Sequence, residues 1–313
     1  MSFKPVVVVA FLLLHAVLFA QNAKPVPSPV VNDFAPIQSF LASGGIEGRE
    51  TGTRGAAIAS DYIASMMQNS SLVPFNPVNA SKVKLSDYFQ PFKLTRIKTE
   101  KSSMDISSSK NKNSRLHLNI YNNFKVRNVL QTMAVETTPV FAGYGIVAPG
   151  LGYNDYTGLN VKGKIVLIME GYPGQNDSGS IAREKFRPAV ENDEYDLDYK
   201  CLEAARQGAT AVITVSKAYL EPKQSNKRIK NVAPVKNPDY EDAEYVLPEN
   251  VNKSMASCYR LNKSSSEKVA ATLGIDFRKA EQQIARQMKF EPLILKNSIK
   301  ISTSTTIDTI TVN

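Results

Sequence analysis

Lys-Ile-Val-Leu-Ile-Met at residues 164–169 is a continuous apolar run, and Ala-Val-Ile-Thr-Val at residues 211–215 is a second one. Both runs are short and rich in β-branched residues, which is typical of strands that are buried on both faces of a sheet. Between them, Asp198–Gln207 has helical spacing and is followed by Gly208, a residue type that commonly ends helices. A strand, a helix and a second strand in this order predict a parallel β-α-β element.

The surrounding sequence predicts a mixed sheet with flanking helices. Val140–Ala142 has the composition of a strand, Gly143–Gly158 is rich in Gly, Pro, Asn and Asp as loops are, and Ile294–Ile301 returns to strand. We therefore expect an α/β to α+β fold, with a mixed β-sheet and flanking helices over residues 137–292. An incomplete helical segment precedes it.

Helices are predicted where a capping residue precedes a periodic apolar pattern. Asp33–Ala42 has helical spacing, and Thr53 is placed to cap a second helix with one apolar face. Ser266 and Asp276 are placed to cap two later helices. The face of the second helix is expected to point to a core and consists of Ile58, Tyr62, Ile63, Met66 and Met67.

Two segments between these helices and the sheet have weaker patterns. Leu85–Leu94 is predicted to be a strand with polar edges. Lys98–Ser114 is rich in Ser, Lys and Asn and has little to bury, so we expect it to be a surface excursion.

The first twenty residues have the pattern of a secretory signal peptide. Lys4 precedes the apolar run Pro5–Phe19, which ends at Ala20 before polar residues. A membrane span is the alternative, but the run is shorter than the ~20 residues that a bilayer needs, and no positively charged flank follows. We expect cleavage near Ala20, a Pro-rich linker at 21–31, and a secreted or periplasmic mature protein without a stable membrane span.

The chain has 313 residues and a formal net charge of +9. The positive excess lies in Lys93–Arg115 and Lys217–Lys236, where Lys98–Lys112 is interleaved with Ser, Asn, Asp and Glu rather than with aromatic residues. A nucleic-acid surface needs basic residues interleaved with aromatics on a folded face. The pattern favours solvated loops, and we expect no nucleic-acid partner.

Two common catalytic patterns are excluded by their context. Gly143–Ala148 loosely matches a dinucleotide-binding loop, but Pro149 and Gly150 follow where that loop must open a helix. No Gly-x-Ser-x-Gly elbow occurs, and cleavage of the leader leaves His117 as the one imidazole. His117 lies between two leucines on an alternating pattern, which favours an ordinary strand histidine over a catalytic base.

Metal donors are few and widely separated in the sequence. His117, Cys201 and Cys258 are the imidazole and thiol donors of the mature chain, whereas a hydrolytic zinc site normally takes several such ligands together with carboxylates. Cys201 and Cys258 can pair as a disulfide if their Cα atoms lie within about 7 Å, and two buried free thiols are the alternative. We assign no catalytic, cofactor-binding or metal-binding residue in this chain.

An acidic cluster offers a second metal hypothesis. Its carboxylates could hold calcium, but the cluster lacks the fixed spacing and the Gly of an EF-hand. A solvated loop with charges at a helix N-terminus is the interpretation that we favour. The cluster consists of Glu191, Asp193, Glu194, Asp196 and Asp198.

Four segments carry a family resemblance. Leu41–Gly55, which reads Leu-Ala-Ser-Gly-Gly-Ile-Glu-Gly-Arg-Glu-Thr-Gly-Thr-Arg-Gly, resembles the opening of secreted M28 family zinc aminopeptidases. Phe141–Pro149, Tyr153–Tyr156 and Val161–Leu167 look like the protease-associated (PA) domain that is inserted in those enzymes. The resemblance implies a catalytic domain that follows this region and holds two zinc ions with His, Asp and Glu ligands.

The resemblance divides the chain into five parts. After the signal peptide (1–20) and linker (21–31), it implies an N-terminal peptidase segment at 32–136, a PA domain at 137–292, and the start of a return into the catalytic domain at 293–313. Zinc is expected only in that missing catalytic domain. We therefore expect no cofactor here and no hydrolysis by this chain alone.

Two functions from different classes follow. The first is the non-catalytic front part of an M28-like aminopeptidase, in which the PA domain shapes substrate access or protein contacts. The alternative is a stand-alone secreted PA-domain module that binds peptides or proteins. In the first case the lead-in helices lack the sheet that they should cover, so we expect association through uncovered apolar helix faces.

Overall fold

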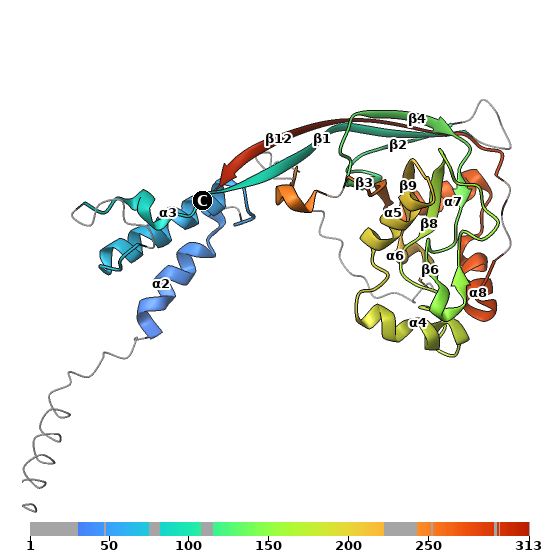
Figure 1. Cartoon of the computed structure of the whole chain (residues 1–313), viewed down its shortest axis with the longest axis horizontal. Helices are drawn as coiled ribbons and strands as arrows, with labels where there is room; N and C mark the ends of the chain where they lie inside the picture. Colours follow the sequence, from blue (N-terminus) through green and yellow to red (C-terminus); the bar gives the residue numbers. More distant parts are fainter. Residues whose placement is uncertain are drawn as a thin grey trace, which may run out of the picture. The chain divides into compact units, whose positions relative to one another are not determined.

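The computed structural model describes residues 31–46, 48–74, 82–107, 115–221, 243–251, 253–290, 293 and 295–312. The predicted signal peptide, and all but one residue of the predicted linker, lie outside these ranges. The chain divides into two compact units, residues 1–90 and 91–313 (Figure 1).

The first unit is helical. It contains α2 (Val31–Leu41) and α3 (Arg54–Asn69), with short 3-10 turns at Gly44–Ile46 and Leu85–Tyr88. Thr53 caps α3 as predicted, because its side-chain oxygen accepts the N–H of Ala56 at 3.3 Å. The strand predicted at Leu85–Leu94 was wrong over its first half, where the 3-10 turn lies.

A close packing contact joins the start of α3 to the segment before it. A Cβ atom built on Gly55 would lie 1.9 Å from the carbonyl oxygen of Ile46 and 2.0 Å from that of Gly48. Any larger residue at position 55 would therefore push this turn off the helix, while glycine lets the buried Ile46 and the helix meet.

The apolar face of α3 was predicted to point to a core. Instead, Ile63, Met66 and Met67 are 43%, 37% and 39% exposed. Ala59 and Ala64 are the buried apolar residues of this helix. The helix formed as its periodicity predicted, but its larger apolar side chains stay accessible.

The second unit contains a five-stranded sheet with a parallel centre. Its order is β3-β11-β9-β8-β5, in which β5, β8, β9 and β11 are parallel and β3 is antiparallel to β11. The predicted β-α-β element is confirmed. The strands are β3 (Phe124–Arg127), β5 (Val140–Phe141), β8 (Ile165–Met169), β9 (Ala211–Val215) and β11 (Ser257–Leu261).

The two faces of this sheet carry two separate apolar clusters. Ile165, Leu167 and Met169 belong to the larger cluster, which takes in α7 (Lys263–Leu273) and α8 (Phe277–Gln287). Val166 and Ile168 belong to a smaller cluster with α5 (Leu197–Arg206). Successive side chains of a strand point to opposite faces, so a strand covered on both faces has to be apolar throughout. This explains the continuous apolar runs.

The second sheet is antiparallel and is built on a long strand pair (Figure 1). β1 (Phe92–Ser107) pairs with β12 (Ile299–Val312), with a register shift between Thr99 and Lys101. The remaining strands of this sheet are shorter. They are β2 (Arg115–Asn119), β4 (Met133–Thr137) and β10 (Ala243–Val246).

The expectation of a surface excursion at Lys98–Ser114 was wrong as far as Ser107. Those residues lie in β1, where Met104 and Ile106 are fully buried in the larger cluster. The polar composition did not predict this strand, because the strand is stabilised by backbone hydrogen bonds to β12, and composition gives no information about that pairing. Residues 108–114 lie outside the described ranges.

Helices connect the strands of the second unit. Asp276 caps α8 as predicted. The cap of α7 is Asn262 rather than Ser266, because the side chain of Asn262 accepts the N–H of Ser265. The predicted loop at Gly143–Gly158 contains a two-stranded ribbon, β6 (Val147–Ala148) and β7 (Tyr153–Asn154). The helices are α4 (Ile181–Glu191), α5 (Leu197–Arg206), α6 (Lys217–Leu220), α7 (Lys263–Leu273) and α8 (Phe277–Gln287).

The fold is of the mixed α+β class, with two principal sheets and flanking helices. Within the described ranges, none of the helices is both long enough and apolar enough to cross a membrane.

Candidate functional site

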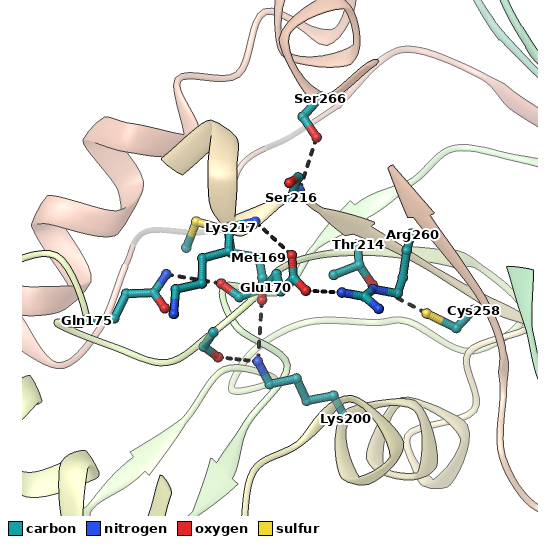
Figure 2. A network of polar contacts seen from close by, with 11 residues as sticks. Met169, Glu170, Gln175, Lys200, Thr214, Ser216, Lys217, Cys258, Arg260 and Ser266 are labelled. Carbon is teal, nitrogen blue, oxygen red and sulfur yellow. Dashed lines mark hydrogen bonds and ion pairs between the residues drawn. The ribbon is translucent and has the colours of Figure 1, made fainter. Parts of the chain in front are cut away.

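Polar side chains gather where the central parallel strands end (Figure 2). Glu170 directly follows β8, and its carboxylate forms an ion pair with Arg260 of β11. Its second oxygen accepts the backbone N–H of Lys217, at the start of α6, at 2.8 Å. The carboxyl ends of parallel strands are the usual place for binding sites in such sheets, which makes this edge the first candidate.

Further hydrogen bonds hold the chain at the same edge. The N–H of Ser216, which follows β9, donates to Oγ of Ser266 on α7 at 3.0 Å. Nε2 of Gln175 donates to the carbonyl oxygen of Glu170 at 3.2 Å. These contacts connect the ends of β8 and β9 to the segments that follow them (Figure 2).

Lys200 is the buried cation of this network. It lies on α5, is 2% exposed, and donates its Nζ to the carbonyl oxygens of Met169 (3.4 Å) and Gly171. The ammonium also lies 5.5 Å from the centre of the Tyr144 ring. Burial lowers the pKa of Lys200 to about 8, although the nearby carboxylates of Asp155 and Glu170 oppose the shift.

Asp155 is the buried carboxyl group of the same region. One carboxylate oxygen accepts the N–H groups of Tyr144 and Ile146, both at 3.0 Å, and the other accepts the hydroxyl of Tyr153. Burial raises the pKa of Asp155 to about 7, while these hydrogen bonds act in the opposite direction. A Cβ atom at Gly143 would lie 2.1 Å from this carboxylate, so the loop closes on Asp155 only with glycine there.

A carboxyl and an amine with pKa values near neutrality are the kind of pair that acid–base catalysis uses. Here both are inaccessible, since Asp155 is 4% exposed and Lys200 is 2% exposed. Both oxygens of Asp155 are already occupied by donors from its own loop. The pair therefore holds the 143–156 segment against β8 and α5, and has no open position for a substrate.

His117 lies on β2 as predicted, and its imidazole is accessible. Its Nδ1 lies 2.6 Å from Oδ1 of Asp105 and its Nε2 lies 3.0 Å from Oδ1 of Asn119. The hydrogen bond to Asp105 raises the pKa of His117. Both ring nitrogens therefore have a side-chain oxygen within hydrogen-bonding distance.

The two cysteines come together although they are distant in the sequence. Cys201 on α5 and Cys258 on β11 are free, buried, and part of the same apolar cluster. Sγ of Cys258 lies 3.4 Å from Oγ1 of Thr214. The hydrogen bond between the two thiols raises the pKa of Cys201 and lowers that of Cys258.

The acidic cluster separates into individual roles. Asp196 caps α5 by accepting the N–H of Tyr199 at 2.8 Å, and Asp198 pairs with Arg127 at 2.7 Å. Glu191 pairs with Arg187 on the surface of α4. Across the described part of the chain, no three His, Cys, Asp or Glu residues gather as metal ligands would. The donors present in these ranges do not fit a two-zinc centre.

Sequence reasoning missed Lys200, Asp155, Glu170 and Arg260. Lys200 carried one signal, because it occupies a core-facing position on a helix that was predicted to pack on the sheet. Glu170 and Arg260 are separated by 90 residues and carried none.

Neither the known protein families nor the curated proteins contain a match to this chain. Among solved structures, it is similar to BSAP, a zinc aminopeptidase from Bacillus subtilis. The TM-score is 0.35 and the sequence identity 14%, over 88% of this chain and 45% of that one. The chain thus spans less than half the length of that enzyme.

Proposed function

We propose that this chain is the non-catalytic N-terminal part of a secreted M28-like zinc aminopeptidase. In this proposal, residues 137–292 form a protease-associated domain that shapes substrate access or protein contacts. Zinc belongs to a catalytic domain outside these residues, and no step of the reaction is assigned to the side chains described above.

The observation that carries the proposal is the internal use of Asp155. Phe141–Pro149 and Tyr153–Tyr156 are the segments that resemble a protease-associated domain, and Asp155 hydrogen-bonds to backbone and side-chain donors in both. The carboxylate of Asp155 thus holds the backbone of its own motif. A motif of this kind specifies a shape, which suits a domain that makes contacts rather than one that reacts.

The first unit supports the same proposal. The segment Leu41–Gly55, which resembles the opening of the aminopeptidases, packs its turn against α3 at Gly55. Further along the helix, Ile63, Met66 and Met67 stay accessible. In the proposal, these exposed side chains contact the catalytic domain.

The test is an activity measurement on the chain from residue 21 onward. With zinc added, we expect hydrolysis of leucine p-nitroanilide no faster than in buffer, and no zinc-dependent heat of binding in calorimetry. Zinc-dependent release of the chromophore that a chelator abolishes would overturn the proposal. An M28 aminopeptidase measured in parallel serves as the positive control.

A further inference from the structure

A groove with a volume of about 270 Å³ runs along the outer side of β3. β3 is the last strand of its sheet, so its outer edge has no neighbouring strand among the described residues. Five consecutive residues from Lys125 to Val129 line the groove, but β11 contributes only Arg260. The opposite wall comes from β1 and from the first residues of β10, Ala243 and Glu244.

The backbone of β3 presents hydrogen-bonding groups to this groove. The N–H of Asn262 donates to the carbonyl oxygen of Asn123 at 3.0 Å, which fixes the alternation of the β3–β11 ladder. The backbone N–H and C=O groups of Lys125 and Arg127 therefore hydrogen-bond to β11, whereas those of Val126 point away from it. At the start of this edge, the N–H of Tyr121 donates to the carbonyl oxygen of Phe124 at 2.9 Å, and beyond this bridge no strand of the described ranges pairs with the edge. Such an edge accepts an extended chain as an added strand.

The charge of the groove is positive. Lys125, Arg127 and Arg260 line it, against the single carboxylate of Glu244. Lys125 and Arg260 are directly opposite each other on neighbouring strands, an arrangement of like charges that destabilises a sheet. Arg260 is partly balanced by Glu170 and Arg127 by Asp198, whereas no ion pair joins Lys125 to a described residue.

We propose that the groove binds an extended acidic peptide, which adds a strand along the outer edge of β3. Side chains of a strand alternate between faces, so peptide carboxylates two residues apart would lie on the face of Lys125 and Arg127, with apolar residues beside Val126. A carboxylate near Lys125 and Arg260 would also relieve their mutual repulsion. The inference deepens the proposed role in protein contacts and rests on it.

The test measures fluorescence anisotropy of a labelled peptide with the core Glu-Val-Glu-Val-Glu, using the chain from residue 21 onward at low salt. We expect saturable binding that weakens as salt is added, because exposed charges are screened. The same peptide with Lys in place of Glu should not bind. Equal binding of the two peptides, or binding of neither, would overturn the proposal.

Two further arms separate strand addition from simple charge attraction. Lys125→Glu should weaken binding about tenfold, while the matched variant Lys185→Glu, on the exposed surface of α4, should leave it unchanged. A peptide N-methylated at alternate residues keeps its charge but loses backbone donors, and should bind the unaltered protein at least tenfold more weakly. Undiminished binding of that peptide would refute strand addition without relying on any variant.

Mass spectrometry of the peptide after incubation distinguishes the two proposals. Zinc-dependent cleavage would overturn the proposed function, whatever the affinity is. Absence of binding with the peptide intact would overturn only the groove.

Discussion

The central parallel strands and the outer half of the β1–β12 pair lie in the same unit, yet different interactions stabilise them. The outer half is the part of the pair in which β12 runs from Ser304 to Val312. Every residue of β8 and β9 is buried. In β12, by contrast, most residues beyond Thr303 are exposed or half-buried. The parallel strands are stabilised chiefly by burial of apolar surface, whereas the outer half of the pair depends on its hydrogen-bonded ladder and surface ion pairs such as Arg96–Asp308.

This difference shows that strand formation and core formation are separate properties of the chain. β1 is 16 residues long, and Met104 and Ile106, near one end, are fully buried in the larger cluster. Leu94 and Ile97, in the other half, are also buried but belong to neither of the two apolar clusters. A strand of this kind does not need a continuous apolar run.

The largest expected effect comes from the same substitution made in each region. Ile165→Ala in β8 removes a fully buried side chain and should lower the free energy of unfolding by about 2–5 kcal/mol. Ile307→Ala in β12 alters a side chain that is 42% exposed and should cost less than about 1 kcal/mol. Urea unfolding followed by circular dichroism measures the free energy of unfolding of both variants. Equal losses in the two variants would contradict the proposed difference between the two regions.

A pH titration tests the same comparison through Asp155. This carboxyl group lies in the 143–156 segment beside the parallel strands, not in the long antiparallel pair. Burial raises its folded pKa from 3.8 to about 7, so the folded state holds the proton more tightly than the unfolded state. The contribution to stability is complete below about pH 4 and is lost as pH rises through 7. At about 1.4 kcal/mol per pKa unit, the loss is on the order of a few kcal/mol.

The matched variant for this titration is Asp155→Asn, which keeps the shape and removes the ionisation. Urea unfolding at several pH values between 4 and 8 should show that the unaltered protein loses stability relative to the variant as pH rises. Parallel pH profiles for the two proteins would show that Asp155 does not titrate in this range.

A smaller effect is expected where the two sheets meet. Oγ1 of Thr303 on β12 lies 2.7 Å from Oγ of Ser102 and 3.0 Å from the hydroxyl of Tyr259 on β11. Thr303→Val leaves these buried hydroxyls with fewer partners and should cost about 1–3 kcal/mol. Thermal unfolding checks this, with Thr306→Val, further along β12, as the control. A larger loss for the control would contradict the assignment of this contact as the joint between the sheets.

Local signals predicted several elements correctly. The runs at 164–169 and 211–215 became β8 and β9, and Gly208 and Thr53 mark helix ends as expected. Each depends on neighbours a few residues away, because capping and strand propensity act over that distance. The same reasoning failed for residues 98–107, whose partner in β12 is about 200 residues away.

The candidate groove and the polar network could not be predicted from local signals either, because their residues are also distant from one another in the sequence. Lys125 and Arg260 become opposite neighbours only when β3 pairs with β11, and Asp155 meets its donors only when its loop closes over Gly143. The amino-acid order alone was enough to predict the buried strands and the caps at Thr53 and Asp276, since these follow from composition and short spacing. Which charges face each other, and which strand edge stays open, depended on contacts between distant segments that no local pattern encodes.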